Sequence, residues 1–109
     1  MSFDPELANR IRALLGDRET TEQKIFGGVA FMVGGNMAIA ASSNGGIIAR
    51  VNPAESAELV ATTPAQLLEM RGKTMAGWLR VDASAVADDT ALAPWVERGA
   101  AYAASLPEK

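Results

Sequence analysis

The sequence predicts a single α+β domain with a mainly antiparallel sheet. Three observations support this class. A helix-opening signal precedes apolar residues at helical spacing near the N-terminus, short apolar runs separated by glycine pairs occupy the middle, and a second helical pattern lies near the C-terminus. The chain has 109 residues, 49% of them apolar, which suits one hydrophobic core. We therefore expect residues 1–109 to form one domain.

The first helix is predicted from about Asp4 to Leu15. Asp4 can accept hydrogen bonds from the free amide groups that open a helix, and Pro5 fixes φ at the first helical position. Gly16 can adopt the left-handed conformation that often follows a helix. A single apolar stripe is formed by Leu7, Ile11, Leu14 and Leu15.

Three apolar runs, residues 25–33, 37–41 and 47–51, predict a three-stranded antiparallel meander. Between them lie residues 34–35 and 44–46, which contain glycine pairs and so permit the positive φ angles of tight turns. We therefore expect each run to pair with the next.

Alternation along these strands predicts which side chains share a face of the sheet. In the first run the two sets are Ile25, Val29, Phe31 and Val33 against Phe26, Ala30 and Met32. In the second run they are Met37, Ile39 and Ala41 against Ala38 and Ala40. Because helices on one face cover only one set, we expect Phe31 and Ile39 in the core and an apolar surface at Phe26 and Met32. A symmetric homodimer that buries exposed sheet surface is the expected assembly. A monomer is the alternative, if two helices straddle the sheet or a loop covers Phe26 and Met32.

Residues 52–81 contain one clear helix start and one ambiguous segment. Asn52 and Pro53 open a second helix that we expect to end near Ala61. Residues 63–66 have the form of another helix start, but residues 67–81 suit a β-hairpin equally well. The residues themselves leave both alternatives open.

The last helix is predicted to begin after Asp88 and Asp89 and to end before Pro107. We expect the two aspartates to cap this helix rather than to bind a metal ion. Its residues at helical spacing are Leu92, Trp95, Val96, Gly99, Tyr102, Ala103 and Leu106.

The composition excludes the commonest catalytic groups. The chain has no histidine and no cysteine, so it lacks Ser-His-Asp and Cys-His machinery, disulfides and the usual zinc ligands. We expect no enzymatic activity and no cofactor. A small enzyme using carboxylates or a serine with a lysine base remains an alternative, with Ser42, Ser43, Lys24 and Lys73 available.

The charge balance and the termini bear on partners and location. With 13 acidic and 10 basic residues the net charge is -3, so direct specific binding to DNA is not expected. The N-terminus is neither basic nor followed by an apolar run, and no stretch is long and apolar enough to span a membrane. We therefore expect a cytoplasmic protein without a membrane partner.

Two groups of side chains are candidates for contacts with a partner. Arg50, Arg71, Lys73 and Arg80 form a basic patch if their strands lie close together, although the alternative is a solvated sheet edge. Large apolar and aromatic side chains that are candidates for an interaction surface are Phe26, Met32, Trp78, Trp95 and Tyr102. For the aromatic residues, burial in the core is the alternative.

Three segments resemble the TfoX/Sxy N-terminal domain family. Residues 25–37, IFGGVAFMVGGNM, are similar to the family signature, and residues 71–78 and 95–107 resemble stand-alone members. The resemblance covers essentially the whole chain. It implies a two-layer α-β-β-β-α-β-β-α domain with a mainly antiparallel sheet, and it favours the hairpin for residues 68–81.

The resemblance carries no catalytic residues over to this chain. It implies a non-enzymatic interaction module, linked to transcriptional or competence regulation through protein contacts. A small-ligand-binding domain is the alternative of a different class, alongside the small enzyme considered above.

Overall fold

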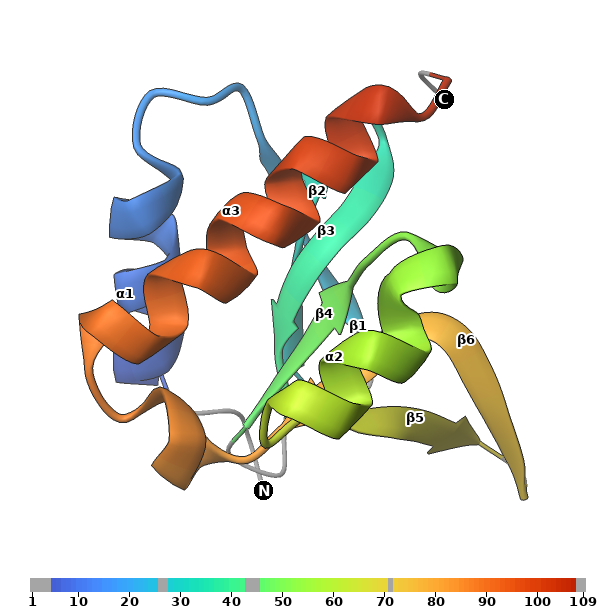
Figure 1. Ribbon diagram of the computed structural model, residues 1–109. Coiled ribbons are helices and arrows are strands. Elements are labelled where there is room, and N and C mark those ends of the chain that lie inside the picture. Colours follow the sequence, from blue (N-terminus) through green and yellow to red (C-terminus); the bar gives the residue numbers. More distant parts are fainter. Residues whose placement is uncertain (1–4, 26–27, 43–45, 71, 108–109) are drawn as a thin grey trace.

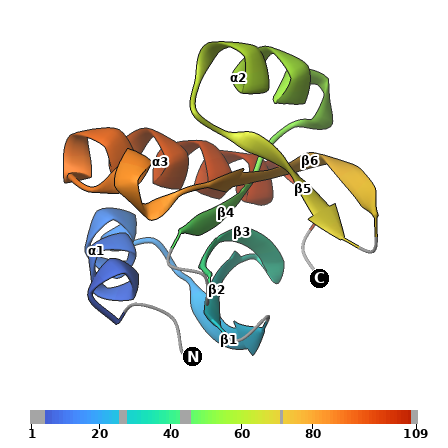
Figure 2. The same cartoon turned by 90° about the horizontal axis from the view of Figure 1, so that it is seen from below.

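A computed structural model describes residues 5–25, 28–42, 46–70 and 72–107. Within these residues a six-stranded sheet, with the order β1-β2-β3-β4-β6-β5 and every neighbouring pair antiparallel, carries the α-helices on one face (Figures 1 and 2). The elements are α1 Pro5–Leu15, β1 Thr21–Ile25, β2 Gly28–Val33, β3 Asn36–Ala41, β4 Ile47–Arg50, the 3-10 helix η1 Pro53–Glu55, α2 Ser56–Thr62, β5 Gln66–Met70, β6 Lys73–Val81, the 3-10 helix η2 Ala83–Val86 and α3 Asp89–Ser105. The predicted two-layer α+β class is confirmed.

The predicted helices and the hairpin are present. Helix α1 buries Leu7, Ile11 and Leu15 and is followed by Gly16 at φ +62°. The ambiguous segment forms the β5–β6 hairpin. In the last helix the Asp88 carboxylate accepts a hydrogen bond from the amide of Ala91 at 2.9 Å, as the capping prediction required. Asp4 lies outside the described residues.

The region around the first apolar run contains one more strand than the sequence predicted. Residues 25–33 were expected to form one strand, but the structure has two, with β1 paired to β2. Strand β1 was missed because it is an edge strand whose described side chains, Thr21 to Lys24, are exposed and polar and show no alternation. Phe26 lies between the two strands and outside the described residues.

Strand β3 departs from simple alternation. Phe31 pairs with Ile39 whereas Met32 pairs with Met37, so Ala38 is an extra residue in a β-bulge. The bulge turns Ala38 toward the helices and Met37 toward the opposite face, which reverses the predicted placement of these two side chains. Phe31 and Ile39 are fully buried beneath the helices, as predicted.

Helix α3 crosses the inner face of the sheet at this bulge. A Cβ atom added to Gly99 would lie 2.3 Å from the backbone oxygen of Ala38, so the helix and the strand approach as closely as a glycine allows. Trp95 and Val96 are buried on the same face of α3. The C-terminal end is fixed by Asn36, whose buried amide donates a hydrogen bond to the backbone oxygen of Pro107 at 2.9 Å.

The outer face of the sheet carries a small second cluster. It consists of the buried residues Ala30, Met37, Ala40 and Ile48, with Met32, Leu68 and Trp78 packed at its margin. All described members come from strands. Among the described helices, none is long and apolar enough to cross a membrane.

Candidate functional site

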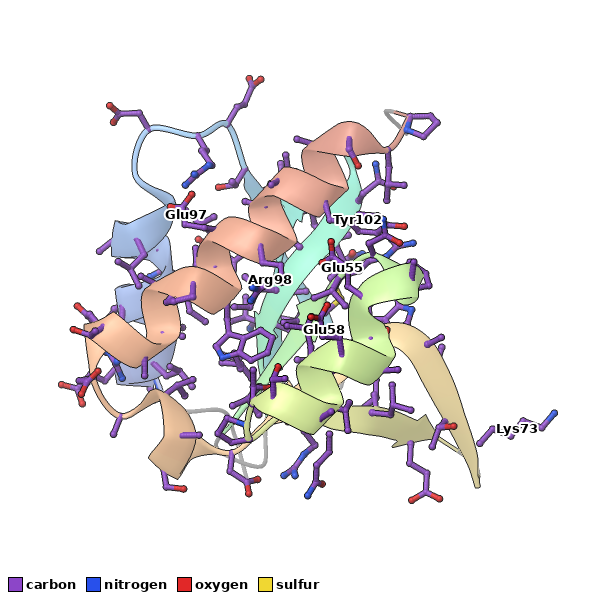
Figure 3. The ribbon with its side chains drawn as sticks, in the orientation of Figure 1. Glu55, Glu58, Lys73, Glu97, Arg98 and Tyr102 are labelled. Atoms are coloured by element: carbon purple, nitrogen blue, oxygen red, sulfur yellow. The ribbon has the colours of Figure 1, made fainter. Side chains whose placement is uncertain are left out.

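A shallow groove of about 670 Å³ lies between η1 and α3. Its walls are formed by Asn52 and Glu55 on one side and by Pro94, Glu97, Arg98, Ala101 and Tyr102 on the other. Figure 3 shows Arg98 and Tyr102 on α3 facing the side on which Glu55 and Glu58 lie. We call this surface the α3 groove.

Local hydrogen bonds position the η1 wall. The side-chain oxygen of Asn52 accepts a hydrogen bond from the amide of Ala54 at 2.9 Å, which confirms the predicted cap. At the start of α2 the buried hydroxyl of Ser56 accepts a hydrogen bond from the amide of Gly77 at 2.6 Å. The backbone oxygen of Gly77 in turn accepts a hydrogen bond from Val51 at 2.8 Å. The segment from β4 to α2 is thereby tied to β6.

Gly77 is required at this junction. Its φ of +86° is unfavourable for residues with a Cβ atom, and such an atom would lie 3.0 Å from Pro53 and 3.1 Å from the backbone oxygen of Val51. The pairing between β5 and β6 shifts here, because Leu67 pairs with Leu79 but Leu68 pairs with Met75. The irregular segment includes Gly77 and leads directly into Trp78.

Trp78 and Tyr102 hold the side chain of Arg50 between strand and helix. The guanidinium carbon of Arg50 lies 4.8 Å from the ring centroid of Trp78 and 5.6 Å from that of Tyr102. All three side chains are half-buried. Stacking of this kind attracts the cation to the ring faces and restricts the arginine to one orientation.

Arg98 is held in the same way one helical turn before Tyr102. Its guanidinium carbon lies 5.3 Å from the ring centroid of Trp95, and the side chain is half-buried in the wall of the α3 groove. Among the described residues, no carboxylate forms an ion pair with Arg98 or with Arg50. Both guanidinium groups therefore have N–H donors that can serve a ligand.

The α3 groove also contains carboxylates. Glu55 lines it, and Glu58 follows one turn later on α2; both are exposed. Glu97 lines the other wall but forms an ion pair with Arg18 from the loop after α1. The arrangement can thus hold a carboxylate at the arginines and a cation at Glu55 and Glu58.

The structure brings two residues of the predicted basic patch onto neighbouring strands and leaves a third apart. Arg50 on β4 stacks on Tyr102 of the α3 groove. Arg80 lies on the adjacent strand β6, two positions beyond Trp78, the residue that pairs with Arg50, and forms an ion pair with Asp82 at 3.0 Å. Lys73 lies at the free tip of the β5–β6 hairpin and points away from the other labelled residues (Figure 3). Arg71 lies outside the described residues.

Of the aromatic and apolar candidates, Tyr102 lines the α3 groove and contacts Arg50. Trp95 is buried and contacts Arg98, whereas Trp78 contacts Arg50 at the margin of the outer cluster. Met32 is half-buried beside the outer cluster, and Phe26 is not among the described residues. The sequence reading missed Arg98, for which the available signal was its position three residues after Trp95 and four before Tyr102 on one helix.

The side chains with shifted pKa values, Arg12 and Glu22, lie outside the α3 groove. Hydrogen bonds from Arg12 at 2.6 and 2.8 Å hold the pKa of the Glu22 carboxyl below its usual range, and the same pairing raises the pKa of Arg12. This pair joins α1 to β1. In the described part of the chain, no group of three or more acidic residues could hold a metal ion.

Comparison with protein families identifies the fold. Residues 13–103 match the family described as the TfoX N-terminal domain. A search of curated proteins found no match. The family match extends from the last turn of α1 almost to the end of α3 and so includes every strand of the sheet described above. The chain therefore belongs to the TfoX N-terminal domain family.

Proposed function

We propose that this chain is a non-enzymatic interaction module that binds a segment of a partner protein in the α3 groove. The observation that carries the proposal is the state of Arg50 and Arg98. Arg98 lines the groove, and Arg50 contacts Tyr102 in its wall. Each guanidinium lies against an aromatic ring, both arginines are half-buried, and neither has an ion-pair partner among the described residues. An arginine already held in one orientation loses little further entropy when a carboxylate binds it through two parallel hydrogen bonds.

The mixed charge of the groove favours a protein segment over a nucleic acid. A phosphate backbone presents only negative charge, which Glu55 and Glu58 would repel. A protein segment can carry an acidic side chain for the arginines and a basic side chain for the glutamates. Arginine, tryptophan and tyrosine are also the residue types that dominate the binding energy of protein interfaces.

The biological setting is part of the same proposal. Membership of the TfoX N-terminal domain family supports a role in transcriptional or competence regulation through protein contacts in the cytoplasm. In that role the module acts by recruiting or occupying a partner, without chemical conversion of it.

A small-ligand-binding domain is the second candidate. The volume of the α3 groove, about 670 Å³, lies within the range of roughly 300–1,000 Å³ that is usual for small-molecule sites. A small dicarboxylate would use the same arginines. The two candidates differ in what is retained by the purified chain, a partner protein or a small molecule, and the following experiments distinguish them.

Affinity capture with three matched variants tests the proposal. The full chain, Arg98→Gln, Arg50→Gln and the control Arg80→Gln are each immobilised and exposed to lysate of the native cell. We expect at least one protein that the parent and Arg80→Gln retain but that both groove variants lose. The control removes one positive charge from an arginine that is already paired with Asp82.

The two tryptophans then locate the binding site in the purified complex. Trp78 contacts Arg50 and Trp95 contacts Arg98, so their indole N–H resonances report on the two arginines separately. We expect both resonances to shift when the captured protein is added. A captured set that is identical for all four baits would refute the proposal. Retention of a small molecule, lost in Arg98→Gln and seen by native mass spectrometry, would favour the second candidate.

A further inference from the structure

We infer that strand β5 is a self-association edge, at which two copies of the chain pair antiparallel to form a two-fold dimer with a continuous sheet. This surface is separate from the α3 groove. It also differs from the outer sheet face that the sequence suggested, because the centre of that face is already buried within one chain.

The two edges of the sheet differ in how they resist pairing. Strand β1 exposes only polar and charged side chains along residues 21–24, including Lys24, and Glu22 is held by Arg12. A lysine on an edge strand opposes pairing with another sheet. Strand β5, QLLEM, has no proline and no basic residue, and its Leu67 and Leu68 are half-buried. Of the two edge strands, β5 is therefore the one without a lysine to oppose pairing, and Glu69 is its one charged residue.

The β5–β6 hairpin is also placed where a second copy can reach it. Its distal part extends past α2 and α3, and its tip is free of the helical layer (Figures 1 and 2). Leu68 pairs there with Met75, and both side chains are half-buried. Strand β5 pairs with β6 alone in the sheet order, so its outer edge presents backbone N–H and C=O groups.

The outer apolar cluster continues to this edge. Leu68 of β5 and Trp78 of β6 pack at the margin of the buried residues Ala40 and Ile48. A second β5 strand placed beside the first continues the same apolar surface across the interface. The contact therefore combines backbone hydrogen bonds with burial of half-exposed apolar side chains.

The sequence of β5 is compatible with its own copy. In an antiparallel pair centred on Leu68, this residue lies opposite its equivalent, and Glu69 lies opposite Leu67 of the second copy. The two Glu69 carboxylates are then not directly opposed, so the register contains no like-charge pair. Closed two-fold contacts are the commonest way in which soluble chains associate. This self-complementarity is why we assign the edge to a second copy.

Sedimentation velocity of the full chain between about 1 and 100 µM tests the inference, since this range brackets dimers of micromolar Kd. We expect a concentration-dependent shift from the 11.4 kDa protomer toward twice that mass. Leu68→Lys places a cation at the centre of the pair and should weaken the dimer at least tenfold. Gln23→Lys makes a matched change on the opposite edge and should leave it unaltered.

Amide hydrogen exchange provides a readout that needs no variant. The β5 amides should exchange at least tenfold more slowly at 100 µM than at 1 µM, while the amides of β1 should not depend on concentration. Three results would each overturn the inference. They are a protomer mass throughout the concentration range, a dimer whose affinity is unchanged in a folded Leu68→Lys variant, or β5 amide exchange rates that do not depend on concentration. None of them bears on the α3 groove, whose capture experiment stands separately.

Discussion

Substitution of Gly99 by alanine tests the packing of α3 on the sheet most directly. The added Cβ atom would lie 2.3 Å from the backbone oxygen of Ala38 and 3.0 Å from its carbonyl carbon. Ordinary contact begins at 3.4 Å, so the helix must move by about 1 Å, the difference between 3.4 and 2.3 Å. A backbone carbonyl within a paired strand cannot turn aside as a flexible side chain can.

The cost follows from what α3 buries. Movement of about 1 Å opens the contacts of Leu92, Val96 and Ala100, and a gap of 0.5–1 Å loses roughly a quarter to a half of the dispersion energy of an atom pair. Overpacking of this kind costs about 1–3 kcal/mol, and the rigid neighbour places Gly99→Ala at the upper end. Alanine returns about 1 kcal/mol through its higher helix propensity. We therefore expect a net loss of about 2 kcal/mol.

Thermal and urea unfolding, followed by circular dichroism, measure this loss. A change of 1 kcal/mol shifts Tm by roughly 4–8 °C for a domain of up to about 100 residues, so we expect a decrease of about 8–16 °C. Ala104→Gly, on the exposed side of the same helix, is the control and should lose only the propensity of about 1 kcal/mol. A Tm for Gly99→Ala equal to or above that of the parent would show that α3 does not meet β3 as described.

Four further predictions concern stability and binding. Ser56→Ala leaves the buried amide of Gly77 without its acceptor and should cost about 1–3 kcal/mol, measured by urea unfolding, with an unchanged midpoint as the contrary result. Glu22→Gln should destabilise by at most about 1 kcal/mol, because both partners are solvent-screened. Since Arg12 lowers the pKa of Glu22 from 4.5, this difference should be present above pH 4.5 and vanish as the pH falls through the folded-state pKa; a difference that grows in acid would contradict it. Phe31→Ala, at a fully buried position, should cost about 3–5 kcal/mol in the same unfolding assay, and a cost below 1 kcal/mol would place this ring outside the core. The isolated chain should bind DNA weakly and without sequence preference, and a submicromolar selective complex at physiological salt, seen by fluorescence anisotropy, would refute this.

Local signals in the sequence determined most of the secondary structure. The apolar stripe of α1, the Asn52 and Asp88 caps and the glycines between strands act through neighbouring residues, and so they could be recognised without the fold. The core positions of Phe31 and Ile39 followed from their spacing, which holds wherever a strand is regular.

Three features depended on contacts between residues distant in sequence. Strand β1 is polar and forms by pairing with β2, so its own residues carry no apolar pattern from which the strand could be predicted. The bulge at Ala38 lies where α3 contacts β3. Its extra residue reverses which face of the sheet the side chains occupy, from Ala38 to the start of the strand. Alternation in β3 was therefore a reliable guide only beyond the bulge.

The candidate site was determined almost entirely by tertiary structure. Trp78 and Arg50 belong to different strands, and Tyr102 comes from a helix more than 20 residues further along the chain. Their stacking requires that α3 lie against the sheet and that the Gly77 junction present the Trp78 ring. Composition and spacing could mark these residues as candidates. Only the packing of helix on sheet decided which of them meet, because stacking of rings on guanidinium groups depends on distance in space and not on distance in sequence.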